Sequence, residues 1–157
     1  MARTIRWMVA GSVVALILAG CASQGPVVPQ PPTVSVSQLR SLSFTPDLVK
    51  FQAKVLIQNN MNGDITFERT DYAVDLFDTQ LFADTFGDML TTHKGATQTV
   101  TFPFQISMED IRKQGLDVLA EQGLRVAFHG QVFCAASYGF DPIPFTAELT
   151  IPIPQIP

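Results

Sequence analysis

Histidine is scarce in this chain, and the short motifs that mark common enzyme sites are missing. The 157 residues include only two histidines, His93 in a turn-like stretch and His129 on the outward face of an expected strand. A metal site or an acid–base pair would need them to converge with carboxylates, and nothing in their spacing calls for this. There is no Gly-x-Ser-x-Gly, no Gly-x-Gly-x-x-Gly and no phosphate-binding loop. We therefore expect a non-enzymatic protein with no catalytic residues, no metal and no cofactor.

A long apolar run is also missing, although a shorter one opens the chain. Arg3 and Arg6 precede an apolar run over residues 7–18, which is too short to span a bilayer comfortably. The Leu-Ala-Gly-Cys sequence at residues 18–21 resembles the processing site of bacterial lipoproteins. This resemblance implies a signal peptide over residues 1–20, cleaved before Cys21, and acylation of the cysteine sulfur. The alternative is an ordinary transmembrane helix, or a secretory signal that happens to end before a cysteine.

The residue after the cysteine bears on where the protein lies. After cleavage, Ala22 would be the second residue of the mature chain. An alanine there, in place of Asp, resembles the outer-membrane sorting pattern of Gram-negative cells. We expect an outer-membrane protein, attached to the membrane through lipid on Cys21, with its domain facing the periplasm. Cleavage leaves 137 residues, enough for one domain of ordinary size.

Loss of the leader removes two arginines, and acylation would occupy one of the two cysteines. The mature chain keeps eight Lys and Arg against fourteen Asp and Glu, a formal balance of −6, which argues against nucleic acid or anionic lipid headgroups as partners. With lipid on Cys21, Cys134 is the only other cysteine, so no intramolecular disulfide can form. Cys134 falls in the core-facing register of an apolar strand, and we expect a buried, unreactive thiol.

Proline and the absence of charge set the domain organisation. Residues 22–33 hold four prolines and no charged side chain, which indicates an extended spacer. We predict a lipid-anchored linker over residues 21–37 and a domain over residues 38–157. Alternatively, Val34 and Val36 begin the first strand of the domain, and we favour a strand somewhere within residues 34–44.

Period-two alternation is the strongest pattern in the rest of the chain. Apolar side chains occupy every second position of residues 47–59, and residues 97–106 and 124–136 alternate in the same way. Residues 65–77, interrupted near Thr70, together with 81–86 and 143–153, complete the predicted strands. Asn and Gly residues at 59–63 and the polar residues 78–80 predict turns.

Proline and helix signals predict how these strands are arranged. Pro103, Pro152 and Pro154 cannot donate to a ladder, so their strands should lie at sheet edges. Residues 107–122 are the helix candidate, with Ser107 as N-cap and Gly123 as stop. About seven strands and one short helix that crosses between sheets predict an all-β, antiparallel β-sandwich.

Two side-chain clusters allow a functional interpretation beside a structural one. Five aspartates fall close together and invite a calcium site, but a solvated acidic face fits their spacing better: Asp71, Asp75, Asp78, Asp84 and Asp88. The twelve phenylalanines indicate a dry core. Five of them could instead line a groove for an acyl chain: Phe51, Phe102, Phe104, Phe128 and Phe145.

Four segments between residues 47 and 157 follow one another in an informative order. They are Val49 to Ile57 leading into Asn60-Met61-Asn62, the segment from Asp71 to Leu76 with its Tyr72, residues 97–106 ending in Pro-Phe-x-Ile, and Pro144-Phe145 followed by residues 151–154. This order resembles the type 2 late embryogenesis abundant (LEA) family, also called the WHy (water stress and hypersensitive response) domain. The chain departs from the family pattern at Met61, where proline is common, and at residues 78–80, where a glycine turn is usual.

The resemblance implies a fold and a role. It implies a sandwich like the fibronectin type III or immunoglobulin domain and an association with desiccation and stress protection, and it implies no catalytic residues. Bacterial members of the family are often lipoproteins. We therefore expect a membrane-anchored periplasmic lipoprotein in desiccation or envelope stress tolerance, with an envelope protein or lipid as its partner. The alternative is a lipid-binding module that holds an acyl chain in a Phe-lined interior.

Overall fold

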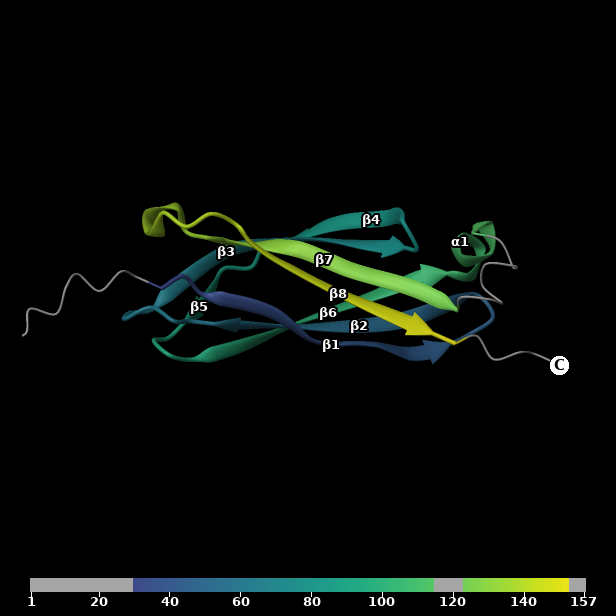
Figure 1. Ribbon diagram of the computed structural model, residues 1–157, viewed down its shortest axis with the longest axis horizontal. Helices are drawn as coiled ribbons and strands as arrows, with labels where there is room; N and C mark the ends of the chain where they lie inside the picture. The colour runs from purple at the N-terminus through teal and green to yellow at the C-terminus, as the bar shows by residue number, and fades with distance from the viewer. Residues whose placement is uncertain (1–29, 115–122, 153–157) are drawn as a thin grey trace, which may run out of the picture.

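Alternating apolar and polar residues give each long strand one side for the core and one for solvent. In the computed structural model, which describes residues 30–114 and 123–152, these strands form two sheets that pack face to face (Figure 1). All the described strand pairs are antiparallel. The prediction of an all-β sandwich is confirmed, with eight strands in place of about seven.

The first sheet has three strands in the order β1-β2-β6. They are β1 (Thr33–Phe44), β2 (Leu48–Gln58) and β6 (Thr97–Ser107). The β6 strand lies at an edge of this sheet, as Pro103 predicted. Its pairing with β2 continues without a register shift through Pro103, which lies opposite Gln52.

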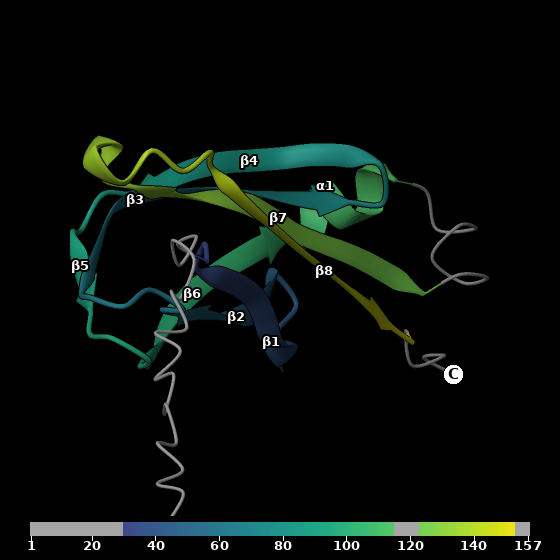
Figure 2. The ribbon, with the colours of Figure 1, turned by 60° about the vertical axis from the view of Figure 1, so that its left-hand side comes forward.

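The second sheet has five strands in the order β4-β3-β7-β8, with β5 also paired to β3. They are β3 (Ile65–Leu76), β4 (Thr79–Phe86), β5 (Leu90–Thr92), β7 (Leu124–Cys134) and β8 (Ile143–Ile151). The β8 strand forms the other edge, as predicted, although Pro152 lies just after the strand and Pro154 lies outside the described residues. Figure 2 shows β1, β2 and β6 together on one side of the sandwich.

The first strand begins earlier than the predicted domain boundary. The range predicted as linker, 21–37, overlaps β1 over residues 33–37, because Val34 and Val36 pack against the core. The Asn60 Nδ2 atom also donates to Thr33 Oγ1 at 2.7 Å, which ties the start of β1 to the loop after β2. The folded part of the chain therefore begins by residue 33.

The turn between β3 and β4 differs from the predicted one. The chain turns at Phe77 and Asp78, and Thr79 and Gln80 already belong to β4. Phe77 takes a φ of 56°, a conformation that glycine adopts more readily. Its backbone N–H donates to the Arg125 carbonyl at 2.9 Å. The expected interruption of β3 near Thr70 is a change of partner in a continuous strand, from β5 to β4.

The described α-helix is short, and in the sequence it connects β6 of the first sheet to the segment that leads into β7 of the second. The α1 helix spans Met108–Lys113, and Ser107 caps it as predicted, because its hydroxyl accepts from the Asp110 N–H at 3.0 Å. Its only buried side chain is Ile111. The rest of the predicted helix, residues 115–122, lies outside the described residues. Within the described ranges, no helix is long and apolar enough to cross a membrane.

Candidate functional site

Phenylalanine side chains fill the space between the two sheets. All five rings that the acyl-groove alternative requires are buried, at 0 to 8% exposure. Phe128 has its ring centroid 5.5 Å from that of Phe102, 5.8 Å from Phe104 and 5.5 Å from Phe145. Phe51 stacks on Phe104 at 5.2 Å. Rings at these distances are in contact, so this part of the interior is packed by the protein itself.

A shallow, open groove of about 660 Å³ lies on the outer face of the five-stranded sheet. Its lining includes Asp71 and Ala73 from β3, which lie opposite Thr85 and Ala83 of β4. On the other side of β3, Asp71 lies opposite Gln131 and Ala73 lies opposite His129. Directly opposed residues share a face of the sheet, so small side chains form the floor of this groove and polar side chains stand around it.

Hydrogen bonds hold the polar side chains of the groove. Thr85 Oγ1 donates to Asp71 Oδ1 at 2.9 Å, and the Arg69 guanidinium contacts the same carboxylate at 3.3 Å. On the other face of the sheet, where Tyr72 packs against the Phe102 and Phe128 rings, Tyr72 donates its hydroxyl proton to Asp84 Oδ2 at 3.3 Å. Burial first, and then the Asp84 carboxylate, raise the pKa of Tyr72, so the phenol stays a donor.

His129 meets a carboxylate beside the groove. Its Nε2 lies 3.0 Å from Asp75 Oδ2, and the other oxygen, Oδ1, is buried without a hydrogen-bond partner in the described residues. A histidine oriented by an aspartate supplies two of the three members of a nucleophilic triad. The third would be a hydroxyl or thiol bonded to the second ring nitrogen, and no such bond occurs in the described part of the chain. This pair has the geometry of a structural contact between β3 and β7.

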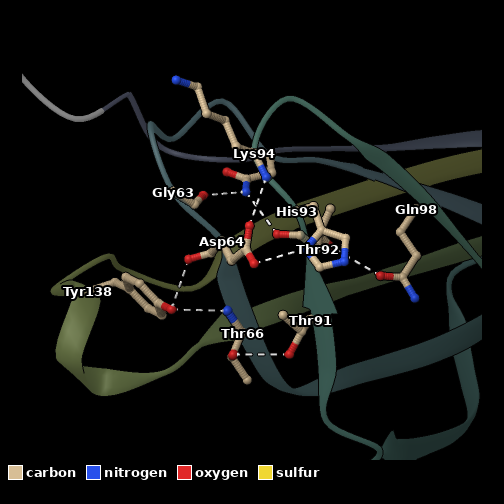
Figure 3. A network of polar contacts seen from close by, with 10 residues as sticks. Gly63, Asp64, Thr66, Thr91, Thr92, His93, Lys94, Gln98 and Tyr138 are labelled. Atoms are coloured by element: carbon tan, nitrogen blue, oxygen red, sulfur yellow. Dashed lines mark hydrogen bonds and ion pairs between the residues drawn. The ribbon is translucent and has the colours of Figure 1, made fainter.

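His93 also meets an aspartate, at the opposite end of the sandwich from α1. Figure 3 shows Asp64 between His93 and Tyr138: His93 Nδ1 lies 2.9 Å from Asp64 Oδ2, and Tyr138 donates to the Asp64 carbonyl at 3.3 Å. The Lys94 backbone N–H donates to Asp64 Oδ1 at 3.2 Å. The hydrogen bond from His93, and then that from Lys94, lower the pKa of Asp64.

Asn59 organises the loops at this end of the molecule. It is fully buried, and its Nδ2 donates to the carbonyls of Gly63 at 2.8 Å and Thr92 at 2.9 Å. Its Oδ1 accepts from the Met61 N–H at 2.8 Å. All three bonds go to backbone atoms, so Asn59 stabilises the loops and has no side-chain group left over for a ligand.

The structure separates the aspartates that invited a calcium site. Asp71, Asp75 and Asp78 contact Arg69, His129 and Arg125 respectively. Over residues 30–114 and 123–152, no group of three His, Cys, Asp or Glu side chains converges so as to hold a metal ion. Cys134 is 9% exposed, and burial raises the pKa of its thiol. Cys21 lies outside the described residues.

The two His–Asp pairs are the contacts that sequence reasoning missed. His129 and Asp75 are 54 residues apart in the chain, and His93 and Asp64 are 29 apart. Only the pairing of β3 with β7 and with β5 brings them together. A weak signal existed, because Asp75 and His129 each occupy an outward position of a predicted strand.

Comparison with known proteins establishes the fold. No family model matches the chain, and no curated protein matches it. The solution structure of an Arabidopsis thaliana protein is 16% identical, with a TM-score of 0.59 over 87% of this chain and 90% of that chain. A solution structure named as a late embryogenesis abundant (LEA) protein is 16% identical, with a TM-score of 0.54 over 78% of this chain and 72% of that chain.

An archaeal structure gives a similar result. A crystal structure of a protein from Archaeoglobus fulgidus is 11% identical, with a TM-score of 0.53 over 82% of this chain and 100% of that chain. At these identities the likeness concerns the fold. This chain therefore has a LEA-like β-sandwich fold.

Proposed function

We propose that this chain is a lipid-anchored, non-enzymatic LEA type 2/WHy-like module at the outer membrane, facing the periplasm and acting in desiccation or envelope stress tolerance. The observation that carries the proposal is a LEA-like sandwich that follows closely on a sequence resembling a lipoprotein processing site. Residues 18–21 supply that sequence, and the sandwich begins with β1 at Thr33. The fold supports the stress role, and the leader supports the anchor.

The short segment has a physical consequence for the domain. Thr33 lies twelve positions after Cys21, and an extended chain over that span reaches roughly 40 Å. Each buried acyl methylene contributes about 0.8 kcal/mol, so two or three chains on Cys21 make release from the membrane very slow. The sandwich would thus stay close to the membrane surface.

The side-chain arrangement supports a non-enzymatic role. Asn59 and Asp64 are both engaged in hydrogen bonds within the domain, and the interior rings contact one another. The alternative function, an acyl chain held between the sheets, would require the rings of Phe102, Phe104 and Phe128 to separate. Native mass spectrometry of the unlipidated domain tests this: a stoichiometric bound lipid would overturn our preference.

The anchor is tested by substitution of the acylated residue. Cells expressing the chain with Cys21→Ala should give no palmitate-labelled product, whereas the wild-type chain should be labelled and should fractionate with the outer membrane. Ser23→Ala is a matched control that leaves the cysteine in place. A Cys21→Ala protein that stays tightly membrane-bound after removal of the leader would exclude the lipid anchor.

The physiological role is tested by drying. A deletion strain should survive desiccation less well than its parent, and the wild-type gene should restore survival. Complementation with Phe51→Ala, which damages the core, should restore it poorly. Equal survival of deletion and parent strains under drying and under envelope stress would rule out the proposed role.

A further inference from the structure

The charges of the first sheet are all of one sign. The strands β1, β2 and β6 contain Arg40, Lys50 and Lys54 and no Asp or Glu. The chain as a whole is acidic, with a net charge of −4, so this distribution is not what its composition suggests. The nearest acidic residues along the chain are Asp47 and Glu109, which lie beyond the ends of these strands.

The three cations share the outer face of this sheet. Lys50 and Lys54 alternate with core residues such as Phe51 and Ala53, so both point away from the core. Arg40 lies opposite Gln52, the outward residue between the two lysines, and donates to it at 3.1 Å. Four residues along a strand span about 13 Å, so the three charges form a compact triangle. None of the three forms an ion pair with a described residue.

An apolar residue adjoins this triangle. Leu42 is 49% exposed and, with Lys50, Pro103 and Gln105, lines a groove of about 220 Å³ on the same sheet. The outward positions of β2 and β6 hold Ser, Thr, Gln, Lys, Leu and Pro, and the one exposed aromatic side chain on the three strands is Phe44, at the end of β1. A surface that stacks nucleic-acid bases uses aromatic side chains, so this face is poorly suited to single strands.

We propose that this basic face, defined by Arg40, Lys50, Lys54 and Leu42, docks on an anionic phospholipid surface. The cations would contact headgroup phosphates, and Leu42 would enter the interfacial region. The inference deepens the proposed function by naming the surface that the sandwich meets. Charge complementarity is one argument for this occupant. The other is the chain length: Gln30, the first described residue, lies nine positions after Cys21, so it can lie at most roughly 30 Å from the acylated cysteine.

A second copy of the chain is a poorer occupant. The aspartates on the outer side of the other sheet already contact Arg69 and His129, which leaves less negative charge for a neighbouring molecule. A membrane offers a dense layer of phosphates that no side chain neutralises. Each cation near such a surface contributes roughly fivefold in affinity, so three contribute about a hundredfold at moderate ionic strength.

The test uses residues 22–157, which include the whole packed core and carry no acyl chain. The protein should sediment with vesicles of phosphatidylcholine mixed with phosphatidylglycerol, and not with phosphatidylcholine alone, and added salt should release it. A triple variant, Arg40→Gln with Lys50→Gln and Lys54→Gln, should bind at least about tenfold more weakly. The control triple variant, Lys94→Gln with Arg112→Gln and Lys113→Gln, has the same net charge and should bind within about twofold of the wild type.

Three outcomes would overturn the proposal, provided that both variants melt as the wild type does. These are equal losses in the two triple variants, no sedimentation of the wild type with the anionic vesicles at low salt, and tighter binding to a single-stranded oligonucleotide or to a second copy than to the vesicles. Because the tested protein carries no lipid, failure here leaves the anchor on Cys21 untouched. Conversely, loss of the palmitate label would not affect this result.

Discussion

Gly130 of β7 lies opposite Tyr72 of β3 on one side and Phe145 of β8 on the other. A Cβ atom at this position would overlap the Asp71 carbonyl oxygen and would lie 2.6 Å from the Phe145 ring and 2.9 Å from Tyr72 Cα. Because two of these neighbours are backbone, the strain cannot be relieved by a change of rotamer. We expect Gly130→Ala to lower the unfolding free energy, measured by urea titration, by about 1–3 kcal/mol. Gly87→Ala, with no atom within 4 Å, should be close to neutral, and equal effects of the two would contradict this account.

Phe51 is the largest side chain on the core face of β2. It is 1% exposed, and its ring stacks on that of Phe104. Truncation removes these contacts and leaves a cavity, so Phe51→Ala should lower the unfolding free energy by about 3–5 kcal/mol in urea denaturation. Phe44→Ala is the matched control, because Phe44 is 50% exposed and should matter much less. A barely changed midpoint for Phe51→Ala would mean that the register of β2 is wrong.

Asp64 gives the molecule an acid-sensitive contact. Hydrogen bonds from His93 and from the Lys94 N–H favour its charged form and lower its pKa. Such a group stabilises the folded state above its unfolded pKa of about 4, and this contribution is lost as the pH falls through the lower folded-state pKa. Asp64→Asn should therefore lower the melting temperature at about pH 7, and by a clearly smaller amount at about pH 2.

The control for this titration is another exposed carboxylate. Asp88→Asn removes a charge that has no hydrogen bond in the described residues, so its effect should be small at both pH values. If the difference between Asp64→Asn and the wild type were the same at both, the contact with His93 would not be the cause.

At the scale of elements, β1 decides where the domain begins. Residues 33–37 pair with the end of β2, with Thr33 opposite Gln58 and Val34 opposite Ile57. A protein that starts at residue 38 loses these pairs, and we expect it to melt several degrees below one that starts at residue 22. Each kcal/mol lost from the unfolding free energy lowers the melting temperature of a small domain by about 2–8 °C. A protein that starts at residue 30 should melt as the longer one does. Equal melting of all three would mean that the first half of β1 adds nothing to stability.

Alternation predicted the strands that bury one face and expose the other. The β2, β6 and β7 strands were evident because core residues such as Val55, Phe102 and Phe128 recur at every second position. The turn between β3 and β4 was predicted at residues 78–80, one residue too late, because Phe77 gives no local sign of a positive φ. The partner of a strand is a long-range property, and neither His–Asp pair could be read from local pattern.

At the scale of the whole molecule, we expect the domain to fold without a metal or a disulfide. The described residues hold no convergent metal ligands, and Cys134 is a buried free thiol. Residues 22–157 should give one cooperative thermal transition that shifts by less than about 1 °C with a chelator or a reductant. A drop of several degrees with chelator would revive the calcium interpretation of the aspartates.

The net charge does not reveal that the charges of the molecule are unevenly distributed. The outer face of the first sheet carries Arg40, Lys50 and Lys54, and most of the acidic residues lie on the second sheet and the loops. Summed composition argued against an anionic partner, and the sheet topology is what gathers these cations on one surface. A sequence without its strand pairing could not reveal this, because Arg40 and Lys54 belong to different strands.

Pro103 affects how these molecules behave when they are crowded together. Because β6 keeps its register with β2 through this residue, the proline nitrogen, which carries no proton, faces away from β2 and toward the unpaired edge of the sheet. A neighbouring strand that tried to extend the sheet would find one donor absent at the middle of β6. As a cell dries and its proteins become concentrated, edge-to-edge joining of sheets is a route to irreversible aggregation. Pro103 makes that route less favourable for a molecule whose neighbours lie close by.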